Sequence, residues 1–249
     1  MKSRFLTSCA VVAGLWLSGA VLRPLVAVAR TTQPVTTAGS ATFGVLGGFR
    51  TLAADLVWLR ANVDWERRDA PATENLLRLA TAIDPRALYF WINGARIMAY
   101  DMPAWRIAAA GGYDRVPAWQ RAGIASEQAQ RALGFLDQAT AQHRASAALW
   151  IERANIELNC LHDVAAAAES YRRAAEQPGA PYYAARLHAE LLRRLGRKAE
   201  ALAWLVRLHP RLPRGDEAAA ADVVLARIRT LERELAVPAA QAYQVPPRP

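Results

Sequence analysis

Apolar residues recur at helical spacing along most of the chain from about residue 49 onward. Within each stretch they return every three or four positions, which places them on one side of an α-helix. Turn residues such as Asp84-Pro85 and Gly196 separate the stretches. Few segments rich in Val, Ile or Thr compete with this pattern, so the sequence predicts an all-α protein whose helices are joined by short loops.

The helical pattern also repeats with a nearly constant period. Trp58 and Trp91 lie 33 residues apart, and Pro178 and Pro213, each at the end of a helical stretch, lie 35 residues apart. The helices that precede these prolines share a ladder of small and large residues: Ala167, Tyr171 and Ala174 in one, and Ala201, Leu205 and Leu208 in the other. A period of this length is typical of stacked helix pairs.

These positions resemble the tetratricopeptide repeat, a unit of two helices and about 34 residues. Trp150 and Ala154 match the start of a further unit. The resemblance implies an antiparallel helix-pair solenoid of about four repeats over residues 49–214. In this family the first helices of the repeats line an inner wall that binds other proteins.

Two segments depart from the period. Trp91 and Trp150 are 59 residues apart, which leaves about 25 residues too many in the second unit. We interpret residues 102–121 as an irregular insertion, because they contain several turn residues. These are Pro103, Gly111, Gly112 and Pro117.

The two ends of the repeat region have their own patterns. Residues 215–236 predict a single amphipathic helix that covers the last repeat, as solenoids require. Residues 237–249 hold four prolines and predict an extended tail. Residues 31–48, which are mostly small or polar, predict a linker ahead of the repeats.

Residues 1–30 have the pattern of a membrane segment. Lys2 and Arg4 precede an apolar run over residues 5–22, whose helix would be roughly 27 Å long, close to the ~30 Å hydrocarbon core. Small residues around Ala29 also fit a secretory signal that is cleaved there. An uncleaved single-pass inner-membrane anchor and a cleaved signal both stay open, and both place the remaining chain in the periplasm.

Candidate chemistry is sparse. Cys160-Leu161-His162-Asp163 lacks the second ligand pair of a metal site, and with one cysteine outside the N-terminal run a disulfide framework is excluded. We expect His209 to face solvent and helical glutamates such as Glu152 and Glu157 to lie on solvated faces. The sequence therefore predicts no enzyme, no metal and no cofactor.

The tryptophans predict packing more than ligand binding. Four of them match packing positions of the repeats: Trp58, Trp65, Trp91 and Trp150. Two others, Trp105 and Trp119, fall within the predicted insertion, where an exposed role is more plausible than for these four.

The resemblance implies that the inner wall holds a protein or peptide partner. The partner-binding residues that it implies are Tyr89, Arg96, Asn155, Tyr183, Arg186 and Arg193. Ile151 stands where a family clamp for acidic chaperone tails has Lys, so that specificity is not implied. We expect a membrane-tethered scaffold or adaptor at the bacterial envelope, with nucleic acid not among its partners and its oligomeric state open.

Two other functions stay open on the sequence. A periplasmic helical hydrolase acting on cell-wall polymer would need a glutamate in a deep cleft. An electrostatic binder of anionic polymer or lipid would use residues 181–214, which carry eight Lys or Arg against two Glu. This local charge of +6 is a large share of the net charge of +9 of the whole chain.

Overall fold

The computed structural model describes residues 39–213 and 215–246, and every regular element in these ranges is helical. The prediction of an all-α protein is confirmed. The predicted membrane segment over residues 1–30 lies outside the described residues. In the ranges that are described, no helix combines the length and the apolar character that crossing a bilayer requires. The helix pairs described below belong to one compact unit of the chain, Phe49–Pro249.

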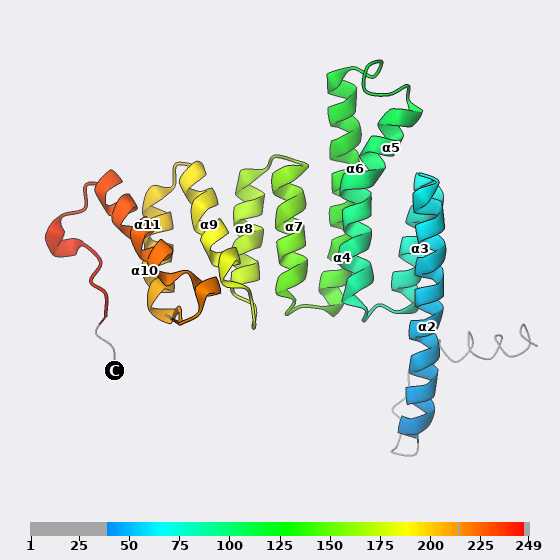
Figure 1. Cartoon of the computed structure of the whole chain (residues 1–249), viewed down its shortest axis with the longest axis horizontal. Coiled ribbons are helices and arrows are strands. Elements are labelled where there is room, and N and C mark those ends of the chain that lie inside the picture. The colour runs from blue at the N-terminus through cyan, green and yellow to red at the C-terminus, as the bar shows by residue number, and fades with distance from the viewer. Residues whose placement is uncertain (1–38, 214, 247–249) are drawn as a thin grey trace, which may run out of the picture. The chain divides into compact units, whose positions relative to one another are not determined.

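The helices follow one another in antiparallel pairs (Figure 1). The first pair is α2 (Gly39–Glu66) and α3 (Ala70–Ile83). Arg50, in the middle part of α2, donates two hydrogen bonds to the Ile83 carbonyl at the end of α3, at 3.0 and 2.8 Å. The later pairs are α4 (Leu88–Arg96) with α6 (Ala118–Gln142), α7 (Ala147–Asn159) with α8 (Val164–Ala175), and α9 (Tyr182–Arg194) with α10 (Lys198–Leu208).

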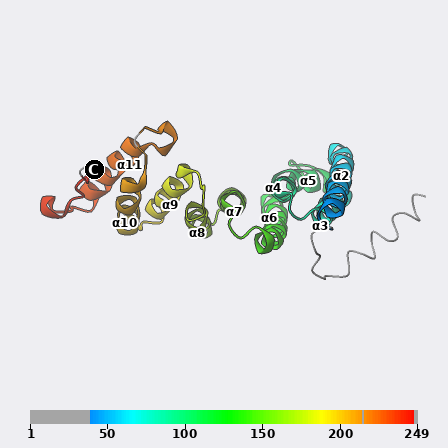
Figure 2. The ribbon, with the colours of Figure 1, turned by 90° about the horizontal axis from the view of Figure 1, so that it is seen from below.

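Each pair packs against the next in chain order. Helix α8 packs on α9, and α10 packs on α11 (Ala221–Glu234), and the same order is visible from below (Figure 2). Buried residues form three clusters, with the largest in the α2 to α7 part and the others around α7 to α9 and α9 to α11. The core therefore follows the helix pairs along the chain.

Local signals set the ends of several helices. The side chains of Asp69, Ser146 and Asp163 accept hydrogen bonds from backbone N–H groups in the first turns of α3, α7 and α8. Gly196 follows α9 with a φ of +77°, which residues other than glycine rarely adopt. The turn predicted at Gly196 is present.

The predicted irregular insertion at residues 102–121 is largely helical, which corrects that interpretation. Helix α4 continues through a π-helical turn, Ile97–Asp101, into α5 (Met102–Ala109). Pro103 has no N–H to donate, and the wider turn bonds Met102 N–H to the Ile97 carbonyl. Only residues 110–117 are non-helical, so the extra length goes mainly into a longer helix pair.

Two further boundaries differ from the sequence interpretation. Residues 39–48, predicted as linker, extend α2, because adding residues to an existing helix costs less than nucleating one. The predicted single helix over residues 215–236 is instead a short 3₁₀ turn, Glu217–Ala219, followed by α11. Ala220 lies between them with a φ of +49°, a left-handed conformation that interrupts a helix.

The C-terminal segment packs against the last pair instead of extending freely. A 3₁₀ turn, Ala239–Gln241, is followed by Tyr243, which contacts the cluster around α10 and α11. The Tyr243 hydroxyl lies 2.9 Å from Nδ1 of His209, and their rings meet edge to face at 5.5 Å. His209 is buried, so the prediction that it faces solvent is wrong.

Candidate partner-binding groove

A groove of about 350 Å³ lies between α9 and α11, with α10 contributing to its floor. Helix α9 presents one face to it at intervals of three and four residues, and α11 does the same from the other side. The residues that line it are Tyr183, Arg186, Leu187, Ala189, Glu190, Arg193, Leu205, Val223, Val224, Arg227 and Leu231.

The lining is apolar at the bottom and partly open to solvent at the rim. Leu205, Val224 and Leu231 are buried and belong to the cluster that joins α9, α10 and α11. At the rim, Val223 is 63% exposed and Tyr183 is 43% exposed. An exposed valine beside a tyrosine gives the groove apolar surface that a partner can cover.

The charged residues of the groove surround a single carboxylate. Arg193 donates from Nη2 and Nε to the two oxygens of Glu190, at 2.7 and 2.9 Å. Arg227 on α11 reaches the same carboxylate at 3.7 Å. The hydrogen bonds from Arg193 hold the pKa of Glu190 below its usual value. With Arg186 included, the lining carries three arginines and one glutamate, a local positive excess.

Arg186 has a structural role in addition to lining the groove. Its Nη1 donates to the carbonyls of Ala218 and Ala219, at 2.8 and 2.9 Å, at the end of the 3₁₀ turn before α11. This contact ties that turn to α9. Replacing Arg186 therefore changes the groove wall itself and does not test ligand binding alone.

The six predicted partner-binding residues separate into two groups. Tyr183, Arg186 and Arg193 all line the groove, whereas Tyr89, Arg96 and Asn155 do not. The assignment of these residues to a binding site stays a prediction. The opposite wall of the groove, on α11, was not recognised in the sequence, where the segment reads only as a capping helix. An exposed apolar residue, Val223, within that amphipathic segment was the available signal.

Arg96 and Asn155 brace neighbouring helices. Arg96, at the end of α4, donates to one oxygen of Glu152 on α7 at 2.8 and 2.7 Å, and Glu152 is 1% exposed. Asn155 accepts a hydrogen bond of 2.6 Å from the Tyr171 hydroxyl on α8. These contacts link α4, α7 and α8 through polar side chains.

Hydrogen bonding and burial shift the pKa values of side chains in this polar region. Glu152 raises the pKa of Arg96 most strongly through its hydrogen bond, and Tyr183 contributes electrostatically to the same shift. Burial raises the pKa of Tyr171, again with a contribution from Tyr183. Nearby, burial raises the pKa of Tyr100 to about 12.

Tyr89 lies apart from this region, at the start of α4. It is 60% exposed, and its ring meets Trp58 of α2 edge to face at 5.4 Å. Trp58 also stacks on Phe90 at 5.1 Å. Tyr89 thus covers the aromatic contact between α2 and α4.

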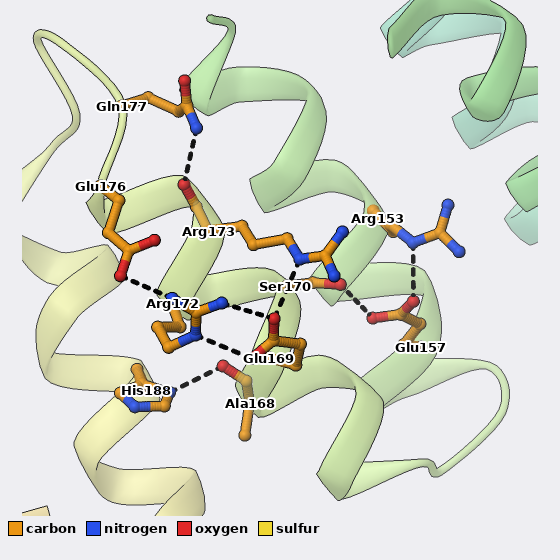
Figure 3. Close-up of polar contacts among 10 residues, drawn as sticks. All are labelled: Arg153, Glu157, Ala168, Glu169, Ser170, Arg172, Arg173, Glu176, Gln177 and His188. Carbon is orange, nitrogen blue, oxygen red and sulfur yellow. Dashed lines mark hydrogen bonds and ion pairs between the residues drawn. The ribbon is translucent and has the colours of Figure 1, made fainter. Parts of the chain in front are cut away.

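Two glutamates that were expected on solvated faces are buried, which corrects the prediction for Glu152 and Glu157. Glu157 accepts hydrogen bonds of 2.6 Å from Ser170 and 2.9 Å from Arg153 (Figure 3). Burial raises the pKa of its carboxyl. The sequence pattern did not indicate the burial of these glutamates. A polar side chain can be buried when a neighbouring helix supplies its hydrogen-bond partners, and a pattern within one helix does not show those partners.

The tryptophans follow the packing prediction only in part. Trp58 and Trp91 are buried at 8% and 4% exposure, as expected. Trp150 is partly buried beneath the Arg173 guanidinium, which lies 4.9 Å from its ring centre. Trp65 is 40% exposed and donates a 2.8 Å hydrogen bond to Asp101, so its core assignment is wrong. Trp119 is 76% exposed, whereas Trp105 is partly buried and its ring meets Trp65.

In the described part of the chain, no group of three or more His, Cys, Asp or Glu side chains is arranged to hold a metal ion. Cys160 donates weakly to the Ala99 carbonyl at 3.8 Å, and burial raises the pKa of its thiol. Neither a protein-family model nor a curated protein sequence matches this chain.

Proposed function

We propose that this protein is a membrane-tethered scaffold, similar in architecture to tetratricopeptide repeat proteins, that binds a segment of a partner protein in the groove between α9 and α11. The observation that carries the proposal is the groove itself: an apolar floor with an open rim and a positive border. The sequential helix pairs, with buried small and large residues at the positions expected for such repeats, support the architecture.

The chemistry of the groove favours a partner segment that combines apolar and acidic side chains. Val223 and Tyr183 offer apolar contact area at the rim. Arg193 and Arg227 already share Glu190, and each guanidinium has further N–H groups that can bind a carboxylate of the partner. A basic partner would meet three arginines and is disfavoured.

The alternative of a purely electrostatic binder loses support from the ion pairs. Within residues 181–214, Arg193 and Arg194 contact Glu190, Arg197 contacts Glu200, and Lys198 contacts Glu234. Four of the eight basic side chains in this range are thus engaged in ion pairs, and of the three carboxylates only Glu234 is not already counted in the local charge of +6. The hydrolase alternative loses support as well, because the buried carboxylates Glu152 and Glu157 are held by hydrogen bonds between helices.

A display library of short peptides tests the binding proposal. The immobilised full chain should enrich sequences with apolar residues next to Asp or Glu over sequences with Lys or Arg. The Val223→Asp variant should lose this enrichment, because it places a carboxylate at the apolar rim and desolvating that charge is unfavourable. Since Val223 is exposed, the helical melting curve should change little.

Trp119→Asp is the matched control, because it removes an exposed apolar side chain outside the groove. It should enrich the same peptides as the unchanged protein. Equal enrichment by the Val223→Asp variant would place binding elsewhere and contradict the proposal.

The tether is tested separately. A reporter that is active only in the periplasm, fused after Pro249, should be active, and the protein should stay in the membrane fraction after a high-salt wash. Release of a chain that begins at Arg30 would establish the cleaved-signal alternative instead.

A further inference from the structure

Helix α2 carries a row of exposed apolar side chains on one face. Phe49, Leu52, Leu56 and Leu59 are 62, 54, 59 and 59% exposed, and Val63 is 37% exposed. Their spacing alternates between three and four residues, which keeps all five within roughly 80° of arc at about 100° per residue. We refer to these five residues as the α2 seam.

The seam faces away from the protein core. The opposite side of the same helix buries Ala54, Trp58 and Ala61 against the aromatic cluster. Helix α2 therefore has two apolar faces, one packed within the unit and one presented outward. An outward apolar face of this length is unusual for a helix that already has a buried face.

The spacing of the seam is that of a coiled-coil core. In a heptad register, Phe49, Leu56 and Val63 occupy the first core position, and Leu52 and Leu59 occupy the second. Leucine at the second core position favours two strands. The seam ends at Glu66, the last residue of α2, which would occupy the next core position.

The charges beside the seam specify the direction of pairing. Asp55 and Arg60 are both exposed and lie on opposite flanks of the seam. They are five residues apart, which is the offset at which flanking residues of two parallel, in-register helices meet. Asp55 of one chain then faces Arg60 of the other. Arg60 also contacts Asp64 of its own helix at 3.2 Å, but its side chain is 56% exposed and can reach a second carboxylate.

We infer that the α2 seam is a self-association surface, and that a second copy of this chain covers it as a parallel, in-register helix pair. Parallel pairing places both N-terminal segments at the same end of the dimer. This arrangement is the one that two chains tethered to one membrane can adopt, and the tether raises their effective concentration. The inference does not depend on the groove between α9 and α11.

Single cysteines test the pairing in the membranes of cells that make the full chain. In a background with Cys9→Ser and Cys160→Ser, Leu59→Cys and Leu52→Cys should each form a covalent dimer under mild oxidation, because equivalent core positions face each other only in a parallel, in-register pair. Asn62→Cys, which lies on the same helix outside the seam, should crosslink severalfold less. Crosslinking of Asn62→Cys to the same extent would overturn the inference.

A second variant separates pairing from folding. Leu56→Glu combined with Leu59→Glu should abolish crosslinking through Leu52→Cys and leave the melting curve nearly unchanged, because both leucines are exposed. Persistent crosslinking would overturn the inference. The inference would also be overturned if, in chains that have not crosslinked, the Leu59→Cys thiol failed to react with a water-soluble maleimide. That result would show the seam to be covered by lipid or by residues 5–22 of the same chain.

Charge exchange tests the direction. Chains with Asp55→Arg and chains with Arg60→Asp, each also carrying Leu59→Cys and a different tag, should crosslink with each other about fivefold more than with themselves. Mixed pairs place opposite charges at both flanks, whereas like pairs place equal charges there. Equal yields of mixed and like pairs would contradict parallel pairing.

Discussion

The aromatic core around α2, α4 and α6 and the interface of α7, α8 and α9 bury their helix faces with different side chains. In the first, Trp58, Phe90, Trp91 and Phe135 fill the space between helices, with the Trp91 and Phe135 rings 4.7 Å apart. In the second, buried alanines line the contact, and Tyr171 and Leu191 are the larger buried members of this cluster. The alanines are Ala154, Ala167, Ala168, Ala174 and Ala184.

Where small side chains form the interface, as between α7, α8 and α9, polar contacts supply part of the stabilisation. Alanines bury little area each, so closely packed helices leave backbone and side-chain polar groups near one another. In this interface Ser170 donates to Glu157, and the His188 Nδ1 lies 2.7 Å from the Ala168 carbonyl (Figure 3). Burial lowers the pKa of His188 despite that contact. The aromatic core should thus be sensitive to lost volume, and the alanine interface to added volume.

The largest effect is expected from Phe135→Ala in the aromatic core. Phe135 is fully buried against Trp91, and its loss should lower the free energy of unfolding by about 3–5 kcal/mol because the rigid neighbours cannot fill the space. Denaturant titration followed by helical circular dichroism measures this. Trp119→Ala, which truncates an exposed ring on the same helix, should change stability by less than about 0.5 kcal/mol. A loss below about 1 kcal/mol for Phe135→Ala would mean that α4 and α6 do not share this core.

The alanine interface should respond to the opposite change. Ala167 is fully buried on α8, and Ala167→Leu should cost about 1–3 kcal/mol, because the added atoms force α7 and α8 apart. Ala165→Leu is the matched control, since Ala165 is exposed on the same helix. It should leave the denaturation midpoint almost unchanged. Equal tolerance of leucine at both positions would show that the interface is not closely packed.

The sequence predicted the helix pairs well because their signals are local. Small and large residues at second-helix spacing, such as Ala167 and Tyr171, are buried where the pattern expected them. Pro103 was misleading, because a π-helical turn just before it accommodates a residue without an N–H donor, and the helix continues. A proline marks a lost donor, but whether the chain leaves the helix depends on the packing of the whole pair.

The groove was predictable from one side only. Tyr183, Arg186 and Arg193 share a helical face in the sequence, and the structure places them together. Their opposite wall on α11 depends on the left-handed residue Ala220, which redirects the chain and has no sequence signal. Arg96 and Asn155 contact neighbouring helices, and inner-wall spacing alone cannot distinguish such a side chain from one that is free for a ligand.

Gly94→Ala tests whether the aromatic core also contains a close helix contact. A Cβ added at Gly94 would lie 2.9 Å from Cε1 of Phe135, which is itself packed and cannot move freely. We expect a loss of about 1 kcal/mol, the balance of this clash and the better helix propensity of alanine. Gly134→Ala on α6, where an added Cβ meets nothing within 4 Å, should instead raise stability by up to about 1 kcal/mol. A gain of stability in both variants would show that Phe135 yields easily.

The smallest effect is expected from a surface ion pair of the alanine region. Hydrogen bonds from Arg172 and then Arg173 lower the pKa of Glu169 to about 2 (Figure 3). A carboxyl whose pKa is lowered in the folded state stabilises the fold above its ordinary pKa of 4.5, and this contribution is lost as the pH falls towards 2. Glu169→Gln should therefore lower the melting temperature slightly at neutral pH and make its decline between these two pH values shallower. Because the Glu169 side chain is 45% exposed, solvent screening should keep the change below about 1 kcal/mol. Glu66→Gln, which replaces an exposed carboxyl at the end of α2, is the control and should leave the dependence of the melting temperature on pH unchanged. If Glu169→Gln also left this dependence unchanged, the paired arginines would not hold the Glu169 carboxylate in solution.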